Sequence, residues 1–246
     1  MNLIELVPHN YEALESQAKK IVNDFDFIQG VNIPDVIRLE IRSYEAVSKL
    51  LQFNITGIPH IRAIDKTVEN TVEVIMTLVD QGLKHVLIIS GDPPHDDRET
   101  FDVTPIDIAK KLTSTCPNLR VYGALDPYRQ SMEDEIFYAR QKIEAGMTGL
   151  FTQPFFDIEL TETYLKELSD LSLFIGVSPV TSEKSYNYWV TRNKVTFPET
   201  FSIEYEDNCK LGSEIIKLSN TYNQHSYLMP IKEDPYKYCN SINNYF

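Results

Sequence analysis

The feature of this sequence that most constrains its fold is a short apolar run that recurs eight times. Each run is followed by a polar or Gly/Pro-containing turn, and then by a longer stretch whose apolar residues lie three and four positions apart. The runs are typical of buried strands and the longer stretches of amphipathic helices, so the repeated unit is a strand followed by a helix. The eight predicted strands cover residues 2–7, 26–31, 56–61, 85–90, 120–124, 149–152, 173–177 and 226–229.

This order of elements distinguishes between two α/β architectures. An open doubly wound sheet that binds a phosphate usually has a Gly-rich turn after its first strand, whereas the turn here reads ELVPHNYE and contains no glycine. Eight similar units without that turn favour a closed (β/α)8 TIM barrel, and roughly 250 residues is an ordinary length for one. We therefore expect a single domain over residues 1–246. The long gap between the last two predicted strands indicates two helices, over residues 182–191 and 205–223.

The composition of the chain argues against several classes of binding partner. The chain has 36 acidic and 23 basic side chains, and its formal net charge of -13 repels the phosphates of nucleic acids and anionic lipids. No segment approaches the ~20 apolar residues of a membrane-spanning helix, so we expect a cytoplasmic protein that binds neither nucleic acid nor membrane. The three cysteines are odd in number and lack the spacing of metal ligands, so we expect neither a disulfide framework nor a metal site.

Polar residues end or follow every predicted strand, which in a barrel is where the chemistry is carried. Glu5 differs from the others because it lies inside an apolar run, LIELVP, where an unpaired carboxylate would be costly. It therefore has either a functional role or a cationic partner such as Lys232. The full set is Glu5, Asn32, Asp35, His60, Arg62, Asp92, Asp126, Gln153, Ser178, Pro179 and Lys232.

Several segments together resemble the methylenetetrahydrofolate reductases, in that family's order. They are IELVP, VNIPD, PHIRAID, SGDPP, QKIEAG, EAGMTGLFTQPFFD and GVSPVTSEKSYNYW, and the resemblance runs from Glu5 to about Met229. The resemblance implies the catalytic barrel alone. It also implies reduction of 5,10-methylenetetrahydrofolate to 5-methyltetrahydrofolate through a bound flavin, FAD or alternatively FMN, with NADH or NADPH as the hydride source. Proteins of this kind serve one-carbon metabolism and methionine supply.

The resemblance also implies roles for individual residues. Glu5 matches a general acid that delivers a proton to folate N10, a task that suits a carboxyl whose pKa is raised by burial. Asp92 matches a catalytic aspartate beside the flavin and pterin, although ahead of two prolines it could be a turn residue. Gln153 matches a glutamine that binds the pterin, or else caps a helix, and Trp189 matches an aromatic over the substrate, or else packs. Implied flavin contacts are His60, Arg62, Gly91, Asp92, Phe101, Asp126 and Lys142.

The chain departs from the family pattern around the implied diphosphate site. Gln141 stands where an arginine often precedes the lysine, the strand-five tyrosine is replaced by Ala124 or displaced to Tyr122, and Glu233 stands where a basic group is common. The ALDP turn is closer to the branch associated with methyltransferases, so the implied partners are the folate substrate and either a homo-oligomer or a methyltransferase. Two other functions stay open: a folate-linked methyl-transfer partner subunit, and a non-catalytic flavin- or folate-binding relic.

Overall fold

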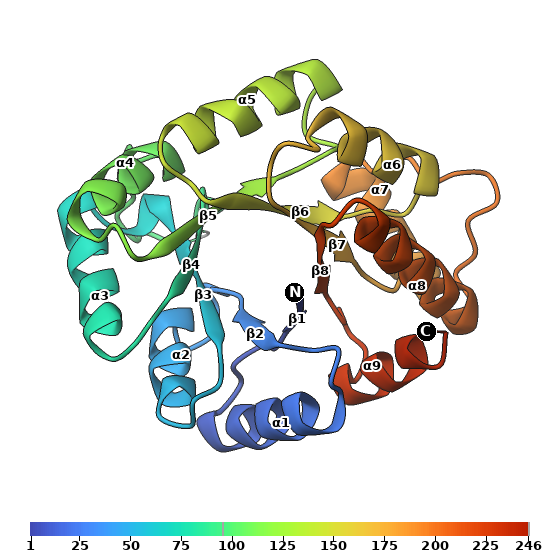
Figure 1. Ribbon diagram of the computed structural model, residues 1–246, viewed down its shortest axis with the longest axis horizontal. Coiled ribbons are helices and arrows are strands. Elements are labelled where there is room, and N and C mark those ends of the chain that lie inside the picture. Colours follow the sequence, from blue (N-terminus) through green and yellow to red (C-terminus); the bar gives the residue numbers. More distant parts are fainter. Residues whose placement is uncertain (95, 246) are drawn as a thin grey trace.

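The computed structural model, which describes residues 1–94 and 96–245, is a closed barrel of parallel strands surrounded by helices (Figure 1). Each strand pairs with its neighbours in the sequence, and β1 pairs with β8 to close the ring. The predicted (β/α)8 architecture is therefore confirmed. The strands are β1 (Asn2–Glu5), β2 (Gly30–Ile33), β3 (Gly57–Arg62), β4 (His85–Ile89), β5 (Arg120–Leu125), β6 (Gly149–Pro154), β7 (Leu173–Val177) and β8 (His225–Leu228).

Most of the helices begin at a residue whose side chain accepts a hydrogen bond from the first helical turn. Examples are Asn10 before α1, Thr104 before α4 and Ser131 before α5, which satisfy N–H groups that have no partner inside the helix. The elements are α1 (Tyr11–Asp24), α2 (Ser43–Leu51), η1 (Ala63–Asp65), α3 (Val68–Asp80), α4 (Pro105–Thr115), α5 (Met132–Glu144), α6 (Ile158–Glu167), α7 (Glu183–Asn193), α8 (Tyr205–Thr221) and α9 (Pro235–Asn243).

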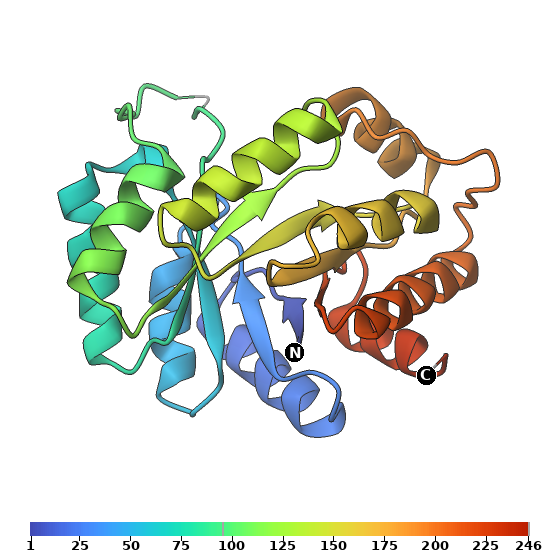
Figure 2. The same cartoon turned by 45° about the horizontal axis from the view of Figure 1, so that its top comes forward.

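The two helices predicted between the last two strands are present as α7 and α8. Helix α8 packs against β7 and β8 and takes the place of a barrel helix, between α6 and α9. Helix α7 lies outside that layer, near the upper right of Figure 2. It packs on a separate apolar cluster that contains Phe156, Val180, Trp189 and Val195.

Strand β2 begins four residues later than the sequence predicts. The apolar residues Phe27 and Ile28, which fall within the predicted strand, belong to the turn after α1; Ile28 is buried in the core between strands and helices, and Phe27 packs against that core. The first strand residue is Gly30, and glycine fits there because the chain is close to its neighbour: a Cβ atom at this position would lie 2.8 Å from the Thr56 carbonyl oxygen.

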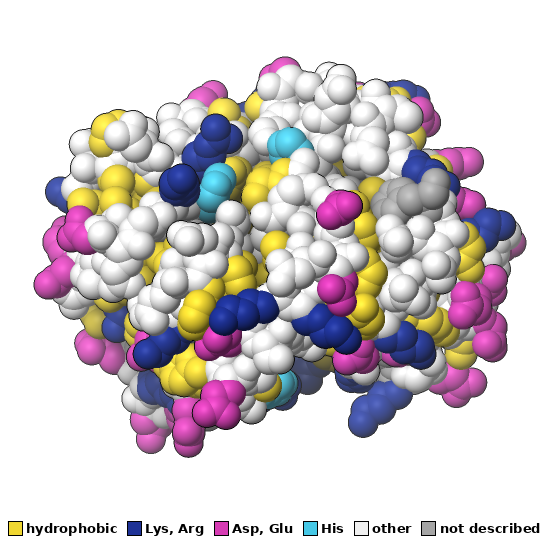
Figure 3. All heavy atoms as spheres, turned by 60° about the horizontal axis from the view of Figure 1, so that its bottom comes forward, with side chains coloured by type: hydrophobic (Ala, Val, Ile, Leu, Met, Phe, Trp, Pro, Cys, Tyr) yellow, Lys and Arg dark blue, Asp and Glu magenta, His cyan; other side chains and the backbone are white. Residues whose placement is uncertain are grey.

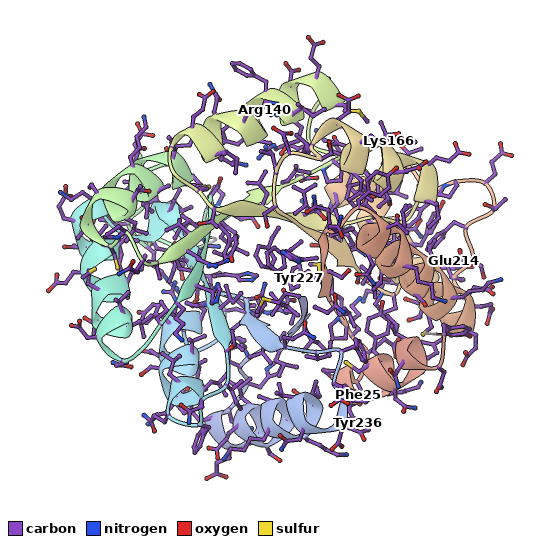
Figure 4. The ribbon with its side chains drawn as sticks, viewed as in Figure 1. Phe25, Arg140, Lys166, Glu214, Tyr227 and Tyr236 are labelled. Atoms are coloured by element: carbon purple, nitrogen blue, oxygen red, sulfur yellow. The ribbon has the colours of Figure 1, made fainter. Side chains whose placement is uncertain are left out.

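The barrel interior is filled by a layer of mostly aromatic side chains. Phe151 and Phe174 stack with ring centroids 4.1 Å apart, and the rings of Tyr122 and Tyr227 meet Phe151 edge-on at 5.3 and 5.4 Å. Figure 4 shows Tyr227 near the centre of the ring of strands. Because side chains alternate along a strand, residues two positions further toward the carboxyl end also point inward. The layer consists of Leu3, Ile58, Leu87, Tyr122, Phe151, Phe174 and Tyr227.

Surface and cysteine features bear on the classes of partner expected above. None of the helices in the described part of the chain has the length and apolar character needed to cross a bilayer. On the face drawn in Figure 3, Asp and Glu side chains are interspersed with Lys and Arg, and histidines lie beside basic side chains in its upper part. The three cysteines, Cys116, Cys209 and Cys239, are free and buried.

Candidate active site at the carboxyl end of the barrel

Strand register brings several of the predicted site residues into one inward layer. Glu5 is the Cα partner of Asn32, and Asn32 is the Cα partner of Ile58, so His60 lies one inward position further along β3. Gln153 is two residues beyond Phe151 and half-buried at the end of β6. Glu5, Asn32 and His60 therefore surround the space directly above the aromatic layer, while Gln153 lies where the register between β6 and β7 shifts.

Glu5 is half-buried at the end of β1, and its carboxylate accepts a hydrogen bond from the Tyr227 hydroxyl of β8. Its partner is thus this hydroxyl and not Lys232, which is exposed. Burial raises the pKa of Glu5 to about 7, and the hydrogen bond from Tyr227 offsets part of that rise by stabilising the charged form. A carboxyl that is close to half-protonated at neutral pH can act as a general acid.

Two buried side chains beside Glu5 have polar atoms without a well-formed hydrogen bond in the part of the chain that the structure describes. They are Nε2 of His60, with 7% of its surface exposed, and both amide atoms of Asn32, which is fully buried beside the Tyr227 hydroxyl. Burial lowers the pKa of His60 to about 3, so its ring is neutral. A buried polar group without a partner costs roughly 1–3 kcal/mol. These atoms are therefore suited to a ligand with polar edges.

The loop that follows β4 is held by Arg62. The Asp92 side chain is exposed, while its backbone carbonyl accepts a hydrogen bond from Arg62 Nη2. Gly91 has φ +85°, and a Cβ there would lie 3.1 Å from Arg62 atoms, so glycine lets the loop pass over the guanidinium. Arg62 is buried and also donates from Nε to Asp65 at 3.0 Å. It fixes the position of Asp92, and its guanidinium has protein partners.

Asp65 connects Arg62 to a second arginine, the half-buried Arg42, that sequence analysis missed. Arg42 donates from Nη2 to Asp65 at 2.6 Å and from Nε to Asp35 at 2.8 Å. The i,i+3 spacing of Arg62 and Asp65 indicates their ion pair in the sequence. Arg42 comes from another strand–helix unit, so spacing along the chain does not indicate its contact with Asp65. Charged side chains from two successive units thus hold the start of the loop that carries Asp92.

Lys142 lies between α5 and β5 and is not brought to the barrel mouth. Only 2% of its surface is exposed, and its ammonium donates to the Ala124 carbonyl and lies 3.9 Å from the centroid of the Tyr138 ring. Burial lowers the pKa of Lys142 to about 8, although the nearby Glu135 carboxylate acts against this. The side chain has a packing position with its hydrogen bond satisfied by the backbone.

Asp126 begins a loop that is anchored by a fully buried carboxylate, Glu135. Glu135 accepts from the Asp126 N–H at 3.0 Å, from Arg129 at 2.6 Å and from Gln130 at 2.8 Å. Burial raises the pKa of Asp126, whose side chain accepts from the Tyr128 N–H at 3.0 Å. Asp126 is half-buried at the carboxyl end of β5, on the same side of the barrel as Glu5.

The two aromatic residues predicted to contact ligands, Phe101 and Trp189, lie in different surroundings. Phe101 is half-buried, and its N–H donates to the Ile64 carbonyl at 2.9 Å, which ties this segment to η1 near Arg62. Trp189 is 4% exposed and packs edge-on against Phe156 at 5.3 Å in the cluster beneath α7. Trp189 therefore packs within this separate cluster, which is the alternative weighed for it from the sequence.

Comparison with known proteins decides the family. The model of the methylenetetrahydrofolate reductase family matches residues 36–217, about three quarters of the chain. The chain belongs to the methylenetetrahydrofolate reductase family. The resemblance inferred from its sequence segments is thereby confirmed.

Similar reductases share modest identity with this chain. The 5,10-methylenetetrahydrofolate reductase of Salmonella typhimurium is 23% identical over 157 residues, covering 60% of this chain and 52% of that protein. The Escherichia coli enzyme of the same name is 23% identical over 149 residues, covering 57% and 49%. A probable methylenetetrahydrofolate reductase (NADPH) of Caenorhabditis elegans is 21% identical over 228 residues, covering 85% and 34%. The matched region is thus about half the length of the bacterial relatives.

Solved structures support the barrel fold alone. A putative phosphonomutase from Burkholderia cenocepacia superposes with a TM-score of 0.58 at 12% identity, covering 99% of this chain and 90% of that one. A 2,3-dimethylmalate lyase gives 0.61 at 7% identity, covering 94% and 75%. Identities this low carry no functional information.

The range matched by the reductase family model leaves out both members of the Glu5–Tyr227 pair. It includes His60, Asp92 and Gln153, but β1 and β8 lie outside residues 36–217. The pair is instead placed by barrel closure, in which Ile4 and Leu228 are Cα partners. Tyr227 is thus a second site residue that sequence analysis missed.

Proposed function

We propose that this chain is a flavoprotein that uses NADH or NADPH to reduce 5,10-methylenetetrahydrofolate to 5-methyltetrahydrofolate. The observation that carries the proposal is the Glu5 carboxyl, which has a pKa of about 7 and lies beside unpaired buried polar groups at the carboxyl end of a barrel of this family. A carboxyl with these properties suits a reaction that needs a proton from the enzyme at neutral pH.

In this proposal Glu5 delivers the proton that opens the folate ring at N10. The ring opening leaves a cationic iminium on the folate, which the exposed carboxylate of Asp92 stabilises through its negative charge. Gln153, at the end of β6, offers an amide that can both donate to and accept from the pterin. Arg62 keeps Asp92 in place by holding its backbone.

The residues at the barrel mouth fit the ring end of a flavin. His60 would offer its unpaired ring nitrogen Nε2 to a planar ligand with polar edges, and when bound the flavin would supply the hydride taken from the nicotinamide. The predicted diphosphate contacts fit less well, because Lys142 is bonded to Ala124 and Arg62 to Asp65 and Asp92. We propose FAD as the cofactor, with FMN as the alternative that needs no dinucleotide half.

The positions of Lys142 and Arg62 favour one competing function, a barrel that binds folate without catalysis. The two functions differ in what the purified protein does with nicotinamide. The test is an anaerobic titration of the full chain, first incubated with FAD or FMN, with NADH and then NADPH. Flavin bands that bleach, and then recover with methylenetetrahydrofolate as 5-methyltetrahydrofolate appears by mass spectrometry, support the proposal. A protein without flavin bands after incubation, or one whose bands no nicotinamide bleaches, overturns it.

A further inference from the structure

Tyr227 has a place in this site that its burial and direction define closely. It lies within the aromatic layer with 2% of its surface exposed, and its hydroxyl extends to Oε2 of Glu5. The ring is held on one side by Phe151, edge-on at 5.4 Å, and faces the His60 ring at 6.3 Å. A ring packed in this way cannot turn its hydroxyl elsewhere without disturbing the core.

The surroundings of Glu5 make this hydroxyl its main polar contact. The elements packed around the carboxyl contribute Tyr227 from β8, Asn32 from β2 and the neutral His60 from β3. Burial and the Tyr227 hydrogen bond are the two influences that set the pKa of Glu5, and they act in opposite directions. Tyr227 therefore offsets the effect of burial without introducing a charge.

We propose that Tyr227 is the positioning residue of the general acid: its hydroxyl fixes the direction of the Glu5 carboxyl, so that the oxygen carrying the transferable proton faces the mouth of the barrel. The inference rests on the proposed function of Glu5 and deepens it. Donation to one carboxylate oxygen leaves the other oxygen free to carry the transferable proton toward the mouth. Without the hydroxyl, the carboxyl rotates freely and its charged form loses its stabilising partner.

The barrel offers a matched control in a second tyrosine of the same layer. The Tyr122 hydroxyl points to the opposite, amino end of the barrel, where it lies 3.1 Å from Nδ1 of His85. Tyr122→Phe therefore removes a buried hydroxyl from the same layer without touching Glu5. Tyr227→Phe and the control Tyr122→Phe are compared with the wild-type chain in two measurements. These are a carbon NMR titration of the Glu5 carboxyl without ligands and the pH profile of folate reduction.

For Tyr227→Phe we expect the pKa of Glu5 to rise by about one pH unit, a tenfold change in its dissociation constant. The alkaline limb of the folate pH profile moves by the same amount, kcat falls about tenfold, and KM for folate is unchanged. Tyr122→Phe leaves the pKa of Glu5 and the profile where they are in the wild type. Replacing Tyr227 with 3-fluorotyrosine keeps the packing and makes the hydroxyl a stronger donor, so it moves the pKa of Glu5 in the opposite direction.

An unchanged pKa of Glu5 in both position-227 variants overturns the inference, as does an equal shift in Tyr122→Phe. The positioning role of Tyr227 and the proposed function can be tested separately. If the wild-type protein does not reduce folate but the Glu5 carboxyl still titrates as expected in the variants, the proposed function is wrong and the contact between Tyr227 and Glu5 stands.

Discussion

Glu5 makes the barrel less stable at the pH at which it would act, and Glu5→Gln measures by how much. Burial raises the pKa of Glu5 to about 7 from an ordinary value of 4.5. Between these values the unfolded chain has released the proton that the folded chain retains, so the free energy of unfolding falls as the pH rises. At 1.36 kcal/mol per pH unit the loss is complete above pH 7 and amounts to about 3 kcal/mol.

Glutamine removes this pH dependence while keeping the shape of the side chain and an oxygen that can accept from Tyr227. In urea unfolding from pH 4.5 to pH 8.5, we expect the variant to gain stability over the wild type steadily with pH, by about 3 kcal/mol at the upper end. The same variant should slow the folate half-reaction by ~10²-fold, while the reduction of flavin by nicotinamide is retained. A stability difference that does not change with pH, or a wild-type protein that is the more stable one at alkaline pH, would show that the pKa of Glu5 is not raised in the folded chain.

Three further predictions address other parts of the site. Gln153→Ala should raise KM for folate while flavin reduction by nicotinamide keeps its rate in stopped-flow traces; equal losses in both steps would show that Gln153 is structural. Asp65→Asn should lower the free energy of unfolding by about 2 kcal/mol, because charged hydrogen bonds from Arg62 and Arg42 are weakened. Its control, Asp170→Asn, alters an exposed pair with Arg140 and should change stability by less than about 0.5 kcal/mol. Trp189→Phe should cost about 1–3 kcal/mol of stability in thermal unfolding and leave KM for folate unchanged, because Trp189 packs on Phe156; a selective rise in KM would restore its predicted place over the substrate.

Sequence periodicity was sufficient for the barrel and for the residues that lie on its strands. Glu5 and His60 occupy regular strand positions, so alternation alone directs them inward and strand order brings them together, whereas Gln153 lies at a register shift between β6 and β7. The start of β2 was predicted wrongly because Phe27 and Ile28 are as apolar as strand residues, although they pack on the core from a turn. Apolar character indicates burial, and it does not separate a strand from a turn that reaches the core.

Sequence periodicity could not give the direction of residues on helices, and it could not predict contacts between the first and last strands of the barrel. Lys142 is on a helix whose inner face turns it toward Ala124, and sequence position alone did not give that direction. Tyr227 and Glu5 are separated by 222 residues, and only closure between β1 and β8 makes them neighbours. A hydrogen bond between the first and last strands has no local signal in the sequence.

The aromatic layer also decides from which side Glu5 can recover its proton. Phe151, Phe174 and their neighbours fill the cross-section of the barrel with packed rings, which separate Glu5 from the amino end. Protons therefore arrive through the same opening that admits the substrate. In the proposed reaction the product then has to move away from Glu5 before the acid is reset, which would place proton uptake after product release and link the two steps in time.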